Sequence, residues 1–344
     1  MKSVADQLIA WYRRHGRSLP WRETRDPYRI WLSEVILQQT RVAQGRDYYL
    51  RFTERYPEVA ALAAADEESV LKLWQGLGYY SRARNLHAAA RQVMEEFGGA
   101  FPRTYEAVRS LRGVGDYTAA AICSFAYDLP CAVVDGNVYR VLARLYDIDD
   151  PIDSSHGQKL FAALAREVLG DAPSAEYNQA IMDFGATCCT PAQPACDRCP
   201  LAEACAARAA GTVAARPVKK GKTKVRDRRF HYLHLVCGDR LLLRRRGPGD
   251  IWQGLYEFPM IESDAEAPEL YASEEFVRWV GNDWKLVGKV DLPKHQLSHQ
   301  RLFATVYRIE VAAFTPEAAA QSIPAGRIGE YAVPRLIERY LLSR

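Results

Sequence analysis

Five of the eight cysteines in this sequence crowd into residues 188–205 and could hold a metal centre. Four of them follow the spacing C-x6-C-x2-C-x5-C: Cys189, Cys196, Cys199 and Cys205. Four thiolates suit either zinc or a cubane iron–sulfur cluster, and zinc is the commoner occupant of such a loop. In a reducing compartment this crowding indicates a metal rather than disulfide bonds.

A glutamate in an apolar segment is the first candidate for acid–base chemistry. Asp26-Pro27 predicts the start of a helix, since aspartate caps helix N-termini and proline fits the first turn. If this helix runs through Thr40, Glu34 shares a side with large apolar residues, which would raise its pKa and keep it a proton donor near neutral pH. The plainer alternative is that Glu34 forms an ion pair with an arginine and has no role in catalysis.

An aspartate that follows a glycine hairpin is the second candidate. Residues 111–115 read Leu-Arg-Gly-Val-Gly and precede an Ala-rich helical stretch, so Gly113 and Gly115 could let backbone N–H groups approach a phosphate. An ordinary turn between helices is the more frequent explanation of such glycines. Asp135 lies twenty residues beyond Gly115, between apolar residues and a glycine, and is expected at the edge of a helix.

The elements that must position these groups fall into two regions. Up to about residue 210, apolar residues recur at spacings of three and four, which predicts several short helices in a region spanning 1–215. Residues 216–229 carry eight basic residues and one acid and predict an exposed linker. Short β-like runs then predict a smaller α+β domain over 230–344, ending in a helix over 334–342.

Composition sets the broad class. A chain of 344 residues with 48% hydrophobic content can bury two cores. The absence of a leader-like N-terminus and of a membrane-length apolar run predicts a cytoplasmic protein, at the nucleoid in a bacterium, without a membrane partner. The net charge of +4 permits a nucleic-acid partner without demanding one.

Two of these motifs resemble those of the endonuclease III superfamily of DNA glycosylases. The cysteine spacing is similar to the superfamily's [4Fe-4S] cluster loop, and the hairpin followed by Gly136 and Asp135 resembles its helix-hairpin-helix-Gly/Pro-Asp motif. The resemblance implies a mainly α helix-hairpin-helix region, with the cluster in a structural role that assists DNA binding. Arg112 departs from the proline that is usual in this hairpin.

Residues 31–40 and 73–87 are very similar to motifs of adenine glycosylases of the MutY type. The resemblance implies a monomer that acts on double-stranded DNA with adenine opposite 8-oxoguanine or guanine. Glu34 would protonate N7 of a flipped-out adenine, and Asp135, helped by the Asn137 side chain, would stabilise the oxocarbenium-like sugar. Tyr117 stands where strand-nicking relatives carry a lysine, so we expect excision without an efficient β-lyase step.

The same resemblance assigns residues that handle the bases. An enzyme that extrudes adenine from the base stack needs side chains that fill the vacated space. Gln39, Leu77 and Tyr79 match the family's residues with this role. The residues expected to line the adenine pocket or contact DNA are Trp21, Arg22, Leu37, Thr40 and Gln179.

The C-terminal region resembles the Nudix-like domain of adenine glycosylases through the W-x-G-L-x-E-F-P signature at residues 252–259. At the place of the carboxylate helix that a Nudix hydrolase needs to hold magnesium, residues 270–275 read Leu-Tyr-Ala-Ser-Glu-Glu, which implies recognition rather than hydrolysis. The segment 294–299 resembles the loop that inspects 8-oxoguanine, with Ser298 and His299 as expected contacts and Leu297 in place of an aromatic residue.

Three alternatives remain at this stage. An endonuclease III-like glycosylase/lyase acting on oxidised pyrimidines would share the cluster and hairpin, but Tyr117, Glu34 and the added domain oppose it. A catalytically silent iron–sulfur DNA-binding protein is the second alternative. A nucleotide pyrophosphohydrolase is the third, and the missing carboxylate helix disfavours it.

Overall fold

The computed structural model describes the chain except for residues 1, 222–224, 265–266 and 344. The described chain divides into two compact units. The first unit comprises Met1–Ala64 and Asn85–Gly221, and the second comprises Ala65–Arg84 and Lys222–Arg344. Among the described residues, no helix has the length and apolar character that crossing a membrane requires.

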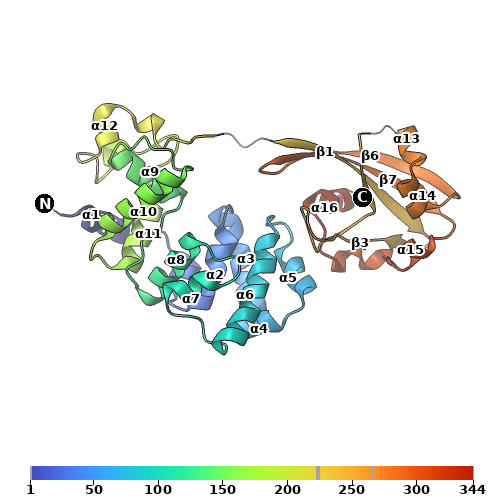
Figure 1. Ribbon diagram of the computed structural model, residues 1–344, viewed down its shortest axis with the longest axis horizontal. Helices are drawn as coiled ribbons and strands as arrows, with labels where there is room; N and C mark the ends of the chain where they lie inside the picture. Colours follow the sequence, from blue (N-terminus) through green and yellow to red (C-terminus); the bar gives the residue numbers. More distant parts are fainter. Residues whose placement is uncertain (1, 222–224, 265–266, 344) are drawn as a thin grey trace. The chain divides into compact units, whose positions relative to one another are not determined.

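The first unit is helical (Figure 1). Its helices are α1 (Val4–His15), α2 (Pro27–Leu37), α3 (Val42–Arg55), α4 (Val59–Ala64), α6 (Ser81–Phe97, whose first turn belongs to the second unit), α7 (Tyr105–Ser110), α8 (Asp116–Tyr127), α9 (Gly136–Leu145), α10 (Ser155–Leu169), α11 (Ser174–Thr187) and α12 (Ala206–Ala210).

Helix α2 begins where the sequence predicts and ends earlier. The Asp26 side chain accepts a hydrogen bond from the backbone N–H of Tyr28, and Pro27 occupies the first turn. The predicted continuation to Thr40 is wrong, because the helix ends at Leu37 and Gln39 adopts a left-handed φ of 54°. A residue in that conformation cannot continue a right-handed helix.

Helices α2 and α8 form the centre of the first unit. Eight of the eleven residues of α2 and nine of the twelve residues of α8 are buried, which is typical of helices in the interior of a domain. Helix α2 packs against α3 and α8, and α11 packs against α1, α8 and α9. This packing brings together residues from α2, α8, the start of α9 and α11, which are far apart in the sequence.

The second unit is built around a six-stranded sheet with the strand order β6-β7-β1-β2-β8, in which β5 also pairs with β1. The two central strands, β1 and β7, are parallel, and β6 runs antiparallel to β7. The strands are β1 (Arg226–Cys237), β2 (Arg240–Leu242), β5 (Met260–Glu262), β6 (Trp284–Gln296), β7 (Gln300–Val311) and β8 (Ser322–Pro324), with β3 (Arg244–Arg245) and β4 (Tyr256–Glu257) in a separate pair.

Side chains alternate between two cores along β1. Phe230 and Tyr232 belong to a core that includes α16 (Arg335–Leu342), whereas Leu233 and Leu235 belong to a core that includes α14 (Glu274–Val280). The remaining helices are α5 (Glu67–Trp74), α13 (Ala267–Tyr271) and α15 (Pro316–Ala319). Residues 334–342, predicted as a terminal helix, contain α16.

Strand β1 starts within the segment 216–229 that the sequence predicts as a linker. Arg226 pairs with Gln300 and Arg229 with Phe303, so 226–229 belong to the sheet. Residues 222–224 of that segment lie outside the described residues. The domain limits 1–215 and 230–344 stay a prediction.

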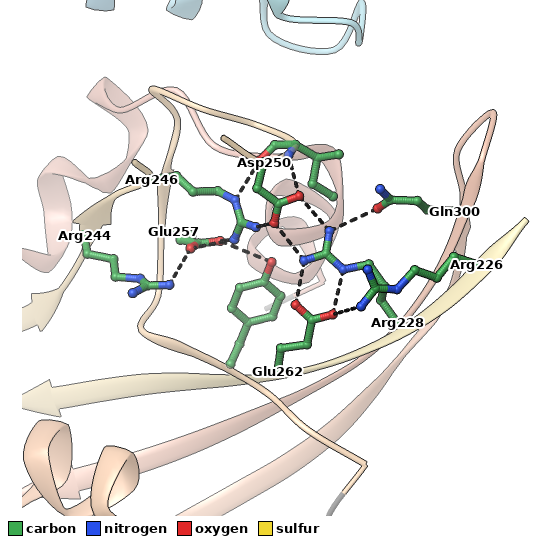
Figure 2. A network of polar contacts seen from close by, with 10 residues as sticks. Arg226, Arg228, Arg244, Arg246, Asp250, Glu257, Glu262 and Gln300 are labelled. Carbon is green, nitrogen blue, oxygen red and sulfur yellow. Dashed lines mark hydrogen bonds and ion pairs between the residues drawn. The ribbon is translucent and has the colours of Figure 1, made fainter. Parts of the chain in front are cut away.

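A network of arginines and carboxylates ties the turns of the second unit to its sheet (Figure 2). Glu257 is fully buried and accepts hydrogen bonds from Arg244 and Arg246 at 2.8–3.0 Å. Asp250 accepts from both Arg246 and Arg228 at 2.6–2.7 Å. Because each buried charge has an opposite partner, the free energy of unfolding depends on the network staying complete.

We therefore expect Glu257→Ala to lower the free energy of unfolding by about 3–5 kcal/mol, since it removes the fully buried carboxylate that pairs with Arg244 and Arg246. Differential scanning calorimetry of the full chain would record this as a lower melting temperature. Arg278→Ala is the matched control, because it breaks an exposed arginine–carboxylate pair with Glu317, a type worth about 0–1 kcal/mol. Equal melting temperatures for the two variants would contradict the expectation.

Candidate active site

Glu34 lies on α2 and is almost fully buried, with 6% of its surface exposed. The Tyr117 hydroxyl on α8 donates a hydrogen bond of 2.8 Å to Glu34 Oε2. Burial raises the pKa of Glu34 to about 7, and the Asp135 carboxylate acts in the same direction, whereas the Tyr117 hydrogen bond opposes the shift. Glu34 can therefore carry a proton near neutral pH and release it to a bound molecule.

Asp135 is the N-cap of α9 and accepts three hydrogen bonds of 2.8 Å. They come from the backbone N–H groups of Asn137 and Val138 and from the Asn137 side chain. Burial raises the pKa of Asp135, and these three donors oppose that rise because they favour the carboxylate. The predicted position at a helix edge is confirmed, as is the hydrogen bond from the Asn137 side chain.

Both carboxylates line one cavity of about 340 Å³, within the range of about 300–1,000 Å³ that small-molecule pockets occupy. The cavity brings together residues from α2, α8, α9 and α11. The sequence-predicted residues that line it are Trp21, Arg22, Glu34, Leu37, Gln39, Thr40, Tyr117, Asp135, Asn137 and Gln179.

Sequence reasoning missed other residues at this cavity. Arg17, Ser33 and Met182 also line it, and Asp183, directly after Met182, holds both Arg17 and Arg22. Asp183 lies in the interior of α11, more than 160 positions from its arginine partners. No local motif could have indicated this pairing, although the aspartate among apolar residues of a buried helix is a weak signal of a buried ion pair.

The two hairpin glycines lie between α7 and α8. Gly113 has a φ of 78°, and a Cβ there would lie 2.6 Å from the Cβ of Asn85, so only glycine fits. Gly115 is the N-cap residue of α8, where it has no side chain to cover the first backbone N–H groups. This leaves the helix start open to an anion.

The remaining predicted base contacts belong to the second unit. Leu77 is buried, whereas Tyr79 has a φ of 47° and is 45% exposed. Ser298 and His299 form the turn between β6 and β7, with Ser298 Oγ 3.2 Å from His299 Nδ1. All four residues line one cavity of about 470 Å³ within this unit, together with Trp252.

The four predicted metal ligands line a small cavity next to α9 and α12, which Cys188 also lines: Cys189, Cys196, Cys199 and Cys205. Among the described residues, no three candidate ligands converge closely enough to hold a metal ion. The donor set is entirely sulfur, which suits a cubane cluster. The Arg144 guanidinium lies 3.5 Å from Cys189 Sγ and could balance the negative charge of thiolates.

Arg140 connects the cysteine loop to the carboxylate site. Its Nε donates to the backbone oxygen of Cys189 at 2.8 Å, and its Nη2 donates to the side-chain oxygen of Asn137 at 2.8 Å. Because Asn137 in turn donates to Asp135, the backbone of the loop and the carboxylate are joined through two side chains.

Two family models match the chain. The model of the HhH-GPD superfamily base excision DNA repair proteins matches residues 32–167, which include Glu34, the hairpin and Asp135. A NUDIX domain model matches residues 231–343.

Curated relatives extend this match along the chain. The adenine DNA glycosylase of Buchnera aphidicola (subsp. Baizongia pistaciae) is 32% identical over 86% of this chain and 83% of the relative. The human adenine DNA glycosylase is 34% identical over 93% of this chain and 68% of the relative. The chain belongs to the adenine DNA glycosylase family. The predicted family and the predictions of a DNA glycosylase and of a DNA-repair protein are thereby confirmed.

Solved structures confirm the fold of the helical part. A thermostable thymine-DNA glycosylase is similar with a TM-score of 0.56 and 28% identity, over 60% of this chain and 95% of that chain. A non-covalent endonuclease III–DNA complex is similar with a TM-score of 0.53 and 22% identity, which shows the fold alone. The predicted fold class, a mainly α helix-hairpin-helix region with a Nudix-like α+β domain, is confirmed.

The pKa of Glu34 leads to a pH prediction. If the protonated carboxyl is the active form, the single-turnover excision rate falls as pH rises through about 7. Tyr117→Phe removes the hydrogen bond that lowers this pKa, so the decline in rate should move to higher pH. Rates measured from about pH 5 to about pH 9 would show the shift.

Tyr127→Phe is the control for this variant, since Tyr127 lies on the same helix and donates to the backbone oxygen of Phe101 instead. The control should keep the wild-type profile. A Tyr117→Phe profile that shifts to lower pH, or does not shift, would show that the hydrogen bond does not control Glu34.

Proposed function

We propose that this protein hydrolyses the N-glycosidic bond of adenine placed opposite 8-oxoguanine or guanine in duplex DNA. The observation that carries the proposal is the pair of buried carboxyl groups, Glu34 and Asp135, in one cavity that also contains the predicted base-binding residues. Family membership supports adenine as the base, since the relatives are named adenine DNA glycosylases.

The two carboxyl groups differ in the donors that surround them. Glu34 accepts one hydrogen bond, from Tyr117, and its pKa of about 7 leaves it partly protonated at neutral pH. Asp135 accepts three hydrogen bonds, which favour its ionised form. This asymmetry supports Glu34 as the acid and Asp135 as the anion that faces the sugar.

In the proposed reaction Glu34 gives its proton to N7 of adenine. The bond between C1′ and the base then breaks with its electron pair on the base, which leaves as neutral adenine. The positive charge that develops on the sugar is stabilised by the Asp135 carboxylate, which supplies an anion beside C1′. Water adds its oxygen to C1′ and gives up one proton, which restores the carboxylic acid of Glu34.

We propose that the enzyme does not cleave the DNA strand efficiently. Strand cleavage of this type needs an amine that forms a Schiff base with C1′. The position taken by that lysine in strand-nicking relatives carries Tyr117, whose hydroxyl is engaged with Glu34. A phenol cannot form a Schiff base, so the product is an abasic site.

The second unit is proposed to read the base opposite adenine. Ser298 and His299 supply polar groups at a cavity that Tyr79 and Trp252 also line, so a base could find both hydrogen-bond partners and aromatic faces there. Gln39, Leu77 and Tyr79 are proposed to fill the space that the extruded adenine leaves. Together with the hairpin glycines, these residues support double-stranded DNA as the partner. We also propose that the enzyme is a monomer that acts in the cytoplasm, at the nucleoid in a bacterium.

The four cysteines at 189, 196, 199 and 205 are proposed to hold a [4Fe-4S] cluster. The four cysteine side chains that line one cavity and the adjacent Arg144 support this assignment. When bound, the cluster supplies a rigid structural centre for the loop rather than a reacting group. Because Arg140 donates hydrogen bonds to both the loop backbone and Asn137, the position of the loop would affect the orientation of the Asn137 side chain.

The proposal predicts which base the protein releases. Single-turnover assays on matched duplexes should show release of adenine opposite 8-oxoguanine and opposite guanine, with strand breaks only after heat and alkali. Glu34→Gln should abolish release and keep DNA binding, because it removes the proton donor and preserves the shape. Glu95→Gln on the exposed face of α6 is the control and should keep full activity.

Release of thymine glycol without release of adenine would replace this proposal with the endonuclease III-like glycosylase/lyase. Strand cleavage by the untreated protein, with borohydride trapping of a covalent complex, would overturn the assignment of a purely hydrolytic enzyme. Normal release by Glu34→Gln would exclude Glu34 as the acid.

The cluster assignment predicts that the purified protein is brown and contains iron and acid-labile sulfide in equal amounts. Cys199→Ser should lose iron, whereas Cys188→Ser should retain it, because Cys188 is not one of the four proposed ligands. Metal analysis and visible absorption would check both variants. A colourless protein that contains zinc would contradict the assignment.

A further inference from the structure

A short segment within the helical part of the sequence belongs to the second unit. Residues 65–84 contain α5 and the turn that follows it. Near the start of this segment, Arg245 pairs with Glu67 at 2.8 Å. At its end, Arg84 donates a hydrogen bond of 2.6 Å to the backbone oxygen of Gln253. The segment is therefore attached to the C-terminal region at both ends.

The turn after α5 presents two of the predicted base contacts. Residues 74–77 form a type II turn, closed by a hydrogen bond of 3.1 Å from the Leu77 N–H to the backbone oxygen of Trp74. Its second residue has a φ of −53° and a ψ of 129°, and its third, Gly76, has the left-handed φ of 97° that such a turn requires. Tyr79 follows closely, so the place of this turn sets where the Leu77 and Tyr79 side chains lie.

The Gln75 side chain attaches this turn to the C-terminal region. Its Nε2 donates a hydrogen bond of 2.8 Å to Glu338 Oε1 on α16, and its Oε1 accepts one of 3.2 Å from the backbone N–H of Val333. Lys72 Nζ also donates to Gln75 Oε1 at 3.3 Å and to the backbone oxygen of Tyr331 at 2.9 Å. The turn is thus held from within by one of its own residues.

The amide of Gln75 suits both of its partners in the C-terminal region. A carboxylate only accepts and a backbone N–H only donates, whereas an amide carries both a donor and an acceptor. Glu338 and the Val333 N–H therefore leave the amide one orientation in which both hydrogen bonds form. A carboxylate at position 75 would keep the bond to Val333 but would face Glu338 at hydrogen-bonding distance, where like charges repel.

The turn that Gln75 holds forms one wall of the cavity of about 470 Å³. Leu77 and Tyr79 line the cavity from this segment, and Ser298 and His299 line it from the turn between β6 and β7. The two walls are far apart in the sequence, so their separation depends on the side-chain contacts that hold the segment. A base can meet both walls at once only if that separation is fixed.

We propose that Gln75 is a positioning residue for recognition of the base opposite adenine. By holding the turn on α16, it fixes Leu77 and Tyr79 relative to the loop that carries Ser298. This inference rests on the proposed function, in which this cavity reads that base. 8-Oxoguanine differs from guanine only by an oxygen at C8 and a hydrogen at N7, so a small displacement of one wall removes the contacts that distinguish the two bases.

The test uses Gln75→Glu and measures two preferences for 8-oxoguanine over guanine. One is the ratio of the single-turnover rates of adenine release opposite the two bases. The other is the ratio of the dissociation constants for duplexes that carry a tetrahydrofuran abasic analogue in place of the adenine. Each preference should fall by about tenfold, the effect of one lost hydrogen bond.

Glu338→Gln is the rescue for this variant. In the double variant the new amide at position 338 donates to the new carboxylate at position 75, which still accepts from the Val333 N–H. The double variant should recover the wild-type preferences. Gln158→Glu is the matched control, since it makes the same substitution at an exposed residue of α10, and it should keep the wild-type preferences as well.

The outcomes separate the inference from the proposed function. If the wild type binds the 8-oxoguanine duplex preferentially but releases no adenine, the proposed reaction fails and the binding preference still decides the inference. A wild type without preference in either assay overturns both.

Unchanged preferences in Gln75→Glu, or lowered preferences that Glu338→Gln does not restore, overturn the inference alone. Equal losses on both duplexes with a lower melting temperature overturn it too, because they assign Gln75 a purely structural role.

Discussion

Burial of one carboxyl group between α2 and α8 is the constraint on which the rest of the site depends. Glu34 keeps a proton near neutral pH because burial excludes water around it, although the hydroxyl of Tyr117 stabilises its ionised form. Most residues of the helices that exclude this water are themselves buried. The pKa of Glu34 therefore departs from that of a surface carboxyl only when the first unit is fully packed.

Asp135 shows how the fold gives two carboxyl groups different sets of hydrogen-bond donors. Asp135 caps α9 and receives backbone donors that every helix N-terminus offers. The cap therefore serves two purposes: it begins the helix and it stabilises an anion beside the cavity. The side chain of Asn137 is oriented by Arg140, which also contacts the cysteine loop, so the surroundings of Asp135 extend well beyond α9.

The sequence predicts the features that depend on neighbours in the chain. The caps at Asp26 and Asp135 and the hairpin glycines follow from local rules, and the motifs indicate which residues share a cavity. The end of α2 was not predicted, because no local rule marks Gln39 as the residue that adopts a left-handed conformation. Asp183 was missed for a related reason: its partners lie near the other end of the first unit, and only the folded chain brings them together.

The pairing of Arg17 and Arg22 with Asp183 also has a consequence for biosynthesis. Residues that enclose the cavity span nearly the whole first unit, from Arg17 to Met182. A nascent chain that has emerged only through α9 carries both carboxyl groups and the hairpin but lacks the wall that α11 provides. The ribosome must therefore release almost all of this unit before a nucleobase can be enclosed, which delays any hydrolytic competence until late in translation.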